Sequence, residues 1–252
     1  MPVVGIDATG LNRSRLRRIL SNESPREPAM IRTRLALCLL LAIATPAFAG
    51  DGDVDKVNGS ISIDATQQAG DLDTVNGSIR IGANATTGDA STVNGSIQLA
   101  DGAHTGALET VNGSIRAGSG MVVDGGVETV NGSIFFDRGS RISKGVSTVN
   151  GAIGLVDTDL GGGIDTVNGD ITVGIGSHVK GGIKVEKPTN GFFGFHVGKP
   201  KPPRIIIGPN AVVDGPLVFE REVKLYVHST AKTGPITGAT AVRFDTPTAP
   251  QD

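Results

Sequence analysis

The side chains in this sequence that are best placed to do chemistry are acidic residues recurring at a nearly constant interval. Each stands three residues before an Asn-Gly pair, and two serines interrupt the series: Asp55, Asp73, Ser91, Glu109, Glu128, Ser147 and Asp165. Stacked carboxylates repel one another unless a basic partner or a cation screens them, and Ca²⁺ prefers oxygen ligands of this kind. The same pattern is typical of side chains that point into water. We predict a solvated column with no metal site.

The other reactive side chains are few and scattered. The four histidines, His104, His178, His196 and His228, share neither a position in the repeat nor the spacing of metal ligands. The sequence has one Cys, one Tyr and no Trp, which leaves little for thiol chemistry or for stacking against sugar rings. No serine lies in a nucleophile-elbow motif. We therefore predict a protein that is not an enzyme and needs no cofactor.

The Asn-Gly pair itself marks a repeat. Successive copies are 18, 18, 18, 19, 19 and 18 residues apart, with the asparagines at Asn58, Asn76, Asn94, Asn112, Asn131, Asn150 and Asn168. Gly adopts positive φ without steric cost and Asn tolerates it, so we predict a structural corner with positive φ in at least one residue of Asn112-Gly113. Stacked Asn side chains can also hydrogen-bond along such a column. The five Asn-Gly-Ser glycosylation sequons are interpreted as a consequence of this corner.

A column of threonines stands two residues before the asparagines. It contains Thr74, Thr92, Thr110, Thr129, Thr148 and Thr166. Regular threonines on a flat face are a feature of ice-binding solenoids, which usually carry two per coil, whereas here Asn occupies the second place. We predict hydrogen bonding at the corner as the role of this column.

Apolar residues alternate with polar ones after each Asn-Gly pair. One column is almost invariant: Ile61, Ile79, Ile97, Ile115, Ile134, Ile153 and Ile171. A second apolar column follows two residues later, and the column between them is variable and mostly polar. This period of two indicates short β-strands with one buried face.

One such unit cannot bury its apolar face alone, but stacked units can, because neighbouring strands pair at about 4.8 Å. About 18 residues per coil suits a cross-section with three sides of roughly six residues each. The predicted fold is all-β: a three-sided parallel β-helix, or β-solenoid, with seven regular coils and about three degenerate ones.

The chain divides into segments by composition. Residues 30–49 have the basic start, the apolar run and the small-residue end of a secretory signal peptide, with cleavage expected after Ala49. Residues 1–29 are interpreted as a leader that results from a misplaced start site. Residues 50–185 carry the regular repeats, residues 186–203 interrupt them, residues 204–245 carry degenerate coils, and residues 246–252 lack the pattern and are expected to be disordered.

The interruption at residues 186–203 concentrates aromatic and basic residues in a chain that has few aromatic residues. It contains Phe192, Phe193, Phe195, Lys199 and Lys201. Apolar groups with basic flanks could contact a membrane surface or a partner protein. The alternative is that the phenylalanines fold back to cover the solenoid.

The C-terminal stretch "IIIGPNAVVDGPLVF" (205–219) resembles the bactofilin family of polymer-forming bacterial proteins, and the "VNGSI" units resemble the repeats of bacterial putative-adhesin domains. The resemblance covers about 190 residues and rests on Gly/Val patterns. It implies a right-handed three-sided β-helix that polymerises end to end without a nucleotide, and it brings no catalytic residues. The signal peptide departs from most bactofilins and favours a role in the cell envelope or outside the cell.

Charge and resemblance together predict a function without catalysis. Residues 50–252 contain 16 basic and 22 acidic residues, a net charge of −6, which disfavours nucleic-acid binding. We expect an exported scaffold protein of the bacterial cell envelope, in the periplasm or at the cell surface, that associates with copies of itself. The alternative is an adhesin-like module that binds a polysaccharide or a surface partner.

Overall fold

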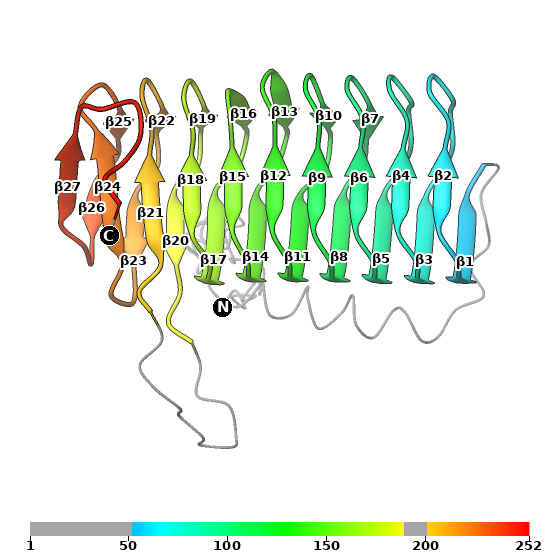
Figure 1. The fold of residues 1–252 in the computed structure, drawn as a ribbon, viewed down its shortest axis with the longest axis horizontal. Coiled ribbons are helices and arrows are strands. Elements are labelled where there is room, and N and C mark those ends of the chain that lie inside the picture. The colour runs from blue at the N-terminus through cyan, green and yellow to red at the C-terminus, as the bar shows by residue number, and fades with distance from the viewer. Residues whose placement is uncertain (1–51, 189–200, 252) are drawn as a thin grey trace, which may run out of the picture. The chain divides into compact units, whose positions relative to one another are not determined.

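The computed structural model describes residues 52–188 and 201–251, and their regular structure consists entirely of β-strands. The strands form three parallel sheets, with about 18 residues from one coil to the next (Figure 1). The predicted all-β, three-sided solenoid of about ten coils is therefore confirmed. No helix that could span a bilayer occurs in the described part of the chain.

The first sheet contains the strands that lead into each Asn-Gly corner, and neighbouring coils pair in register, as in Asp55↔Asp73 and Asn58↔Asn76. Its ten strands, in order, are β1 (Val54–Asn58), β3 (Leu72–Asn76), β5 (Ala90–Asn94), β8 (Leu108–Asn112), β11 (Val127–Asn131), β14 (Val146–Asn150), β17 (Ile164–Asn168), β20 (Ile183–Val185), β23 (Leu217–Phe219) and β26 (Ile236–Thr237).

The second sheet contains the strands that follow each corner. Its ten strands are β2 (Ile61–Ile63), β4 (Ile79–Ile81), β6 (Ile97–Leu99), β9 (Ile115–Ala117), β12 (Ile134–Phe136), β15 (Ile153–Leu155), β18 (Ile171–Val173), β21 (Arg204–Ile207), β24 (Lys224–His228) and β27 (Ala241–Phe244).

The third sheet closes each coil and has shorter strands. Its seven strands are β7 (His104–Thr105), β10 (Val122–Val123), β13 (Ser140–Ile142), β16 (Thr158–Leu160), β19 (His178–Val179), β22 (Val212–Val213) and β25 (Lys232–Thr233). In the first coils, isolated bridges such as Gln68↔Thr86 take the place of strands.

The interior of the solenoid is built from the alternating apolar columns. In β9 the side chains of Ile115 and Ala117 are buried while that of Arg116 is exposed, and the same pattern recurs in β2, β4, β6 and β12. Ile115 has no exposed surface. The predicted inward and outward columns of the second sheet are therefore confirmed.

The interruption replaces a single corner and leaves the stack in register. The strand β20 ends at Val185, and β21 begins at Arg204 and pairs with β18 through Ile171↔Ile205. Both ends of the interruption thus lie where the Asn-Gly corner of the eighth coil would stand.

The last described residues have no strand but contact earlier coils. The Arg204 guanidinium lies over the Tyr226 ring, 5.0 Å from its centroid, and donates a hydrogen bond to the Pro250 carbonyl. The segment after β27 therefore runs back across the second sheet toward β21, as Figure 1 shows.

Candidate functional site

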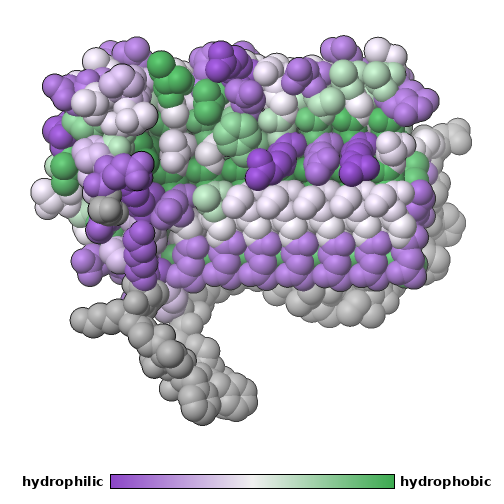
Figure 2. All heavy atoms as spheres, in the orientation of Figure 1, coloured by the Kyte–Doolittle hydropathy of each residue, from purple (hydrophilic) through white to green (hydrophobic). Residues whose placement is uncertain are grey.

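The seven asparagines form one continuous ladder on the solenoid surface. From Asn76 onward, each Asn Nδ2 donates a hydrogen bond to the Oδ1 of the Asn one coil earlier, at 2.9–3.1 Å. The ladder has a direction, because every amide nitrogen faces the N-terminal coils and every amide oxygen faces the C-terminal ones. Figure 2 shows a hydrophilic row and a row of intermediate hydropathy that run along the regular coils with little change from coil to coil.

In every corner after the first, the glycine is required by close packing against the preceding coil. At most of these positions its backbone angles do not require it. Neither Asn112 nor Gly113 has positive φ, so that prediction is wrong. A Cβ on Gly113 would instead lie 1.9 Å from the Gly95 carbonyl oxygen in the preceding coil. Among the seven corners only Gly59 and Gly151 have positive φ.

The threonine column points inward and ties neighbouring corners together. Thr74, Thr92, Thr110, Thr129 and Thr148 each donate a hydrogen bond to a corner glycine carbonyl of the previous coil, at 2.9–3.2 Å. Because these side chains are buried, they do not form an ice-binding surface. Thr166 is also buried, but within residues 52–188 and 201–251 its hydroxyl has no hydrogen-bond partner.

The acidic column lies on the outer face of the first sheet. Asp73 is exposed, but partial desolvation of its carboxylate raises its pKa. The hydrogen bond from Ser91 opposes this rise, and nearby carboxylates such as Asp55 add to it. In the eighth coil the column continues with Lys184, whose Nζ lies 3.1 Å from Glu186 Oε1. No group of three or more metal-ligating side chains occurs within residues 52–188 and 201–251.

Two histidines occupy the same column, contrary to the interpretation from spacing. Residues of the third sheet pair in the series His104, Val122, Arg141, Asp159 and His178. Each of these two histidines contacts an aspartate of the following coil through Nε2 and Oδ2 at 2.7 Å, namely Asp124 for the first and Asp214 for the second. The signal in the sequence was the repeated Val-Val-Asp motif at 122–124 and 212–214.

His228 is separate from this pair of sites. Its ring packs edge-on against Phe244, with centroids 5.0 Å apart, and its Nδ1 lies 2.9 Å from the Thr230 hydroxyl. His196 lies outside the described residues.

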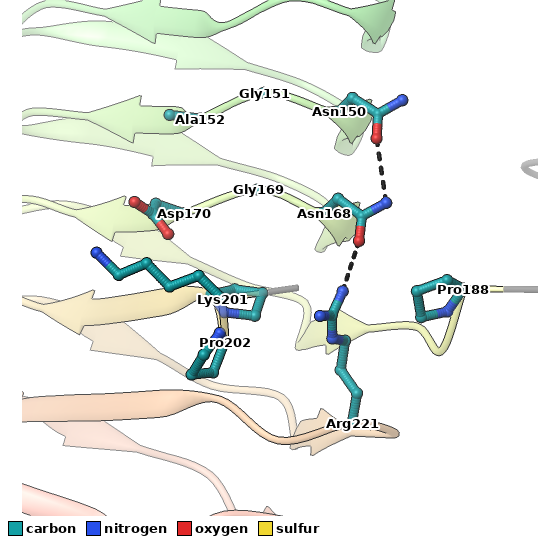
Figure 3. A pocket seen from close by; sticks show the side chains of 11 residues that line it. Asn150, Gly151, Ala152, Asn168, Gly169, Asp170, Pro188, Lys201, Pro202 and Arg221 are labelled. Atoms are coloured by element: carbon teal, nitrogen blue, oxygen red, sulfur yellow. Dashed lines mark hydrogen bonds between the residues drawn. The ribbon is translucent and has the colours of Figure 1, made fainter. Parts of the chain in front are cut away.

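The Asn ladder ends at the interrupted corner, where an arginine caps it. Arg221 Nη1 donates a hydrogen bond to Asn168 Oδ1 at 2.5 Å (Figure 3). The same nitrogen also donates to the Val167 carbonyl at 3.0 Å. Since Val185 pairs with Phe219, Arg221 follows β23 at the place where the ninth coil would carry its asparagine. The eighth coil has no corner asparagine, and the arginine side chain, which is longer than that of asparagine, reaches back over this coil to Asn168.

A hollow of about 570 Å³ lies beside this cap. Its polar lining includes Asn150, Asn168, Asp170, Lys201 and Arg221, and Figure 3 shows that these groups come from several successive coils. Asp170 Oδ1 accepts a hydrogen bond from the Arg204 backbone N–H at 2.7 Å. The lining side chains thus include neutral amides, a carboxylate and two cations, which together supply hydrogen-bond donors and acceptors. They include no nucleophile paired with a base.

Most of the predicted partner loop lies outside the described residues. Phe192, Phe193, Phe195 and Lys199 lie outside the described residues, whereas Lys201 is exposed and lines the hollow. Sequence reasoning missed Arg221, although counting the coil period through the interruption would have placed it in the asparagine column.

Comparison with known proteins adds no relationship. No protein-family model, no curated protein and no solved structure matches the chain.

Proposed function

We propose that this protein is a non-enzymatic scaffold of the bacterial cell envelope that associates with copies of itself through its terminal coils. Export by the segment 30–49 places it in the periplasm or at the cell surface. The resemblance to bactofilins and to adhesin repeats agrees with a structural role. The single observation that carries the proposal is the unpaired backbone edge at each end of the described stack.

The backbone edges follow from the order of the sheets. Each inner strand pairs on both sides, but within the described chain β1 and β2 pair only with β3 and β4. At the other end, β25, β26 and β27 likewise have one neighbour each. Unpaired N–H and C=O groups along a strand are a template for pairing with another chain.

Charge distribution favours joining unlike ends. Residues 52–112 contain eight acidic and two basic residues, a net charge of −6, whereas residues 201–251 contain four acidic and six basic residues, a net charge of +2. An acidic first end would attract a basic last end and repel another first end. Head-to-tail contact of this kind adds copies without closing a ring unless the geometry curves.

An edge-blocking variant tests the association. The Val54 N–H donates to the Asp71 carbonyl of the next coil, so in a parallel ladder the N–H of Asp55 points to the free edge. Asp55→Pro removes both the carboxylate and this N–H donor. Asp55→Ala removes the same carboxylate but keeps the N–H donor.

We expect sedimentation velocity of residues 50–252 to show concentration-dependent association that Asp55→Pro reduces much more than Asp55→Ala. Raising the salt concentration should weaken the association of the parent chain, because unlike charges at the contact are screened. Equal behaviour of the two variants, or a chain that stays monomeric, would count against the proposal.

The hollow at the interrupted corner favours a second function, a binding module for a polysaccharide or surface partner. Its amide, guanidinium, ammonium and carboxylate groups are of the kinds that bind sugar hydroxyls. A glycan array with the parent chain tests this function, with Arg221→Met and Lys201→Met as variants of the hollow. Binding that both variants weaken, by a chain that sediments as a monomer, would favour the adhesin-like alternative.

A further inference from the structure

We infer that Asn168-Gly169 is a site of spontaneous covalent modification, at which the asparagine amide converts to aspartate or isoaspartate through a cyclic imide. The chain contains eight Asn-Gly pairs: seven stand in the repeated corners in nearly identical surroundings, and the eighth, Asn190-Gly191, lies outside the described residues. The structure distinguishes Asn168-Gly169 from the other corners by the hydrogen bonds of its glycine amide and of its side-chain carbonyl.

The reaction balances within the chain and water. The Gly169 backbone nitrogen loses its proton to hydroxide and attacks Cγ of Asn168, forming a C–N bond. The Cγ–Nδ2 bond breaks, the leaving nitrogen takes a proton from water and departs as ammonia, and the hydroxide used in the first step is regenerated. The product is a five-membered succinimide. Water then opens the ring at either carbonyl and leaves a normal aspartate or an isoaspartate with the backbone passing through the side chain.

The glycine amide that must act as the nucleophile is occupied in the other six corners. The N–H groups of Gly59, Gly77, Gly95, Gly113, Gly132 and Gly151 each donate to the Asn carbonyl of the following coil, at 2.9–3.3 Å. These bonds hold the proton and fix the nitrogen in the ladder. Among the described residues the Gly169 N–H has no acceptor, because the interruption removes the corner that would supply one.

The Asn168 side chain is also activated for attack. Arg221 Nη1 donates to its Oδ1 at 2.5 Å, so a cation faces the oxygen on which negative charge develops when the carbonyl carbon becomes tetrahedral. In the six earlier corners that oxygen accepts from a neutral amide instead.

The surroundings of this corner allow the reaction to proceed. Asn168 is exposed and Gly169 is buried, but both residues line the hollow of about 570 Å³, which is large enough to admit water. The buried hydroxyl of Thr166 lacks the partner that the equivalent hydroxyls have in five other coils. The corner is therefore held by fewer hydrogen bonds than the others.

The product changes the end of the ladder. A carboxylate at position 168 cannot donate to Asn150 Oδ1, as Nδ2 now does at 3.1 Å, but it forms an ion pair with Arg221. The reaction would thus detach the cap from the ladder while keeping the arginine in place. An isoaspartate would in addition lengthen the backbone at the base of the interruption.

The test is a time course of the parent chain at mildly alkaline pH and physiological temperature. Tryptic peptides are sequenced by mass spectrometry, with fragmentation that assigns the amide-to-acid mass change to a single asparagine and separates the seven corners from Asn190. Among the seven corner sites we expect Asn168 to convert first, at least about fivefold faster than each of the other six, a factor that corresponds to one backbone hydrogen bond. Equal rates at all seven, or faster conversion at Asn58, would overturn the inference.

Two controls separate structure from local sequence. In concentrated urea the seven sites should convert at similar rates, since the ladder is then absent, and a persistent lead of Asn168 there would overturn the inference. Arg221→Met should slow conversion at Asn168 and leave the other six rates unchanged. If Arg221→Met has no effect while the urea result holds, the unpaired Gly169 amide alone explains the site, and the role given to the guanidinium is wrong.

Discussion

Replacing the glycine of an inner corner by alanine probes how closely the coils pack. In Gly113→Ala the added methyl would lie 1.9 Å from the Gly95 carbonyl oxygen and 2.5 Å from its carbonyl carbon, whereas non-bonded carbon atoms normally approach to about 3.5 Å. Both atoms belong to backbone that hydrogen-bonds to the next coil through Gly95 N–H, so they cannot yield without opening the stack. Overpacking typically costs 1–3 kcal/mol, and we expect about 3 kcal/mol here.

The matched control is Gly154→Ala in β15. A methyl there would meet only the Phe135 ring, at 3.2 Å, and that side chain can rotate. Alanine also lowers the entropy of the unfolded chain, so we expect a change within about 1 kcal/mol, in the stabilising direction. Urea unfolding followed by circular dichroism measures both variants. Equal stability of Gly113→Ala and the parent chain would refute the close-packing explanation.

Four further substitutions test the columns. Ile115→Asp buries an unpaired charge and should lower the free energy of unfolding by more than about 4 kcal/mol, and an unchanged thermal midpoint would contradict its inward position. Thr129→Val should lower the free energy of unfolding by about 1 kcal/mol, because it leaves the Gly113 carbonyl without its donor. Thr166→Val should be neutral or stabilising, because it removes an unpaired hydroxyl. Equal effects of the two variants in urea unfolding would refute this difference. Because the pKa of Asp73 is raised in the folded state, the folded state binds the proton more readily than the unfolded state does. Stability should therefore rise as pH falls from this raised pKa toward the ordinary value of 3.8. Asp73→Asn should accordingly stabilise the protein at neutral pH only. Unfolding curves at neutral and acid pH check this, and a stabilisation of equal size at both would contradict it.

The sequence predicts the fold well because the same physical requirement is repeated in every coil. Seven copies of one apolar column, such as the one that contains Ile115, leave little doubt about which side chains face inward. The period also places the asparagines in one stack. Backbone angles at the corner were predicted wrongly, because the pair Asn112-Gly113 was considered alone, whereas its glycine is required by the coil that packs against it.

The candidate site was harder to predict because it forms where the period fails. Arg221 lies 53 residues after Asn168 in the sequence, and only the resumed register after the interruption brings them together. The pairing of His104 with Asp124 was missed for a similar reason, since it depends on contacts between coils and not on spacing within one. Interactions across a solenoid can be predicted only when residues are counted by coil.

The central claim is that copies of this protein join through their terminal coils, and electron microscopy of residues 50–252 tests it most directly. We predict unbranched filaments that grow with protein concentration and shorten at high salt, with the strand spacing of about 4.8 Å continuing across the junctions between copies. Particles of single-chain size at every concentration and salt would contradict the claim.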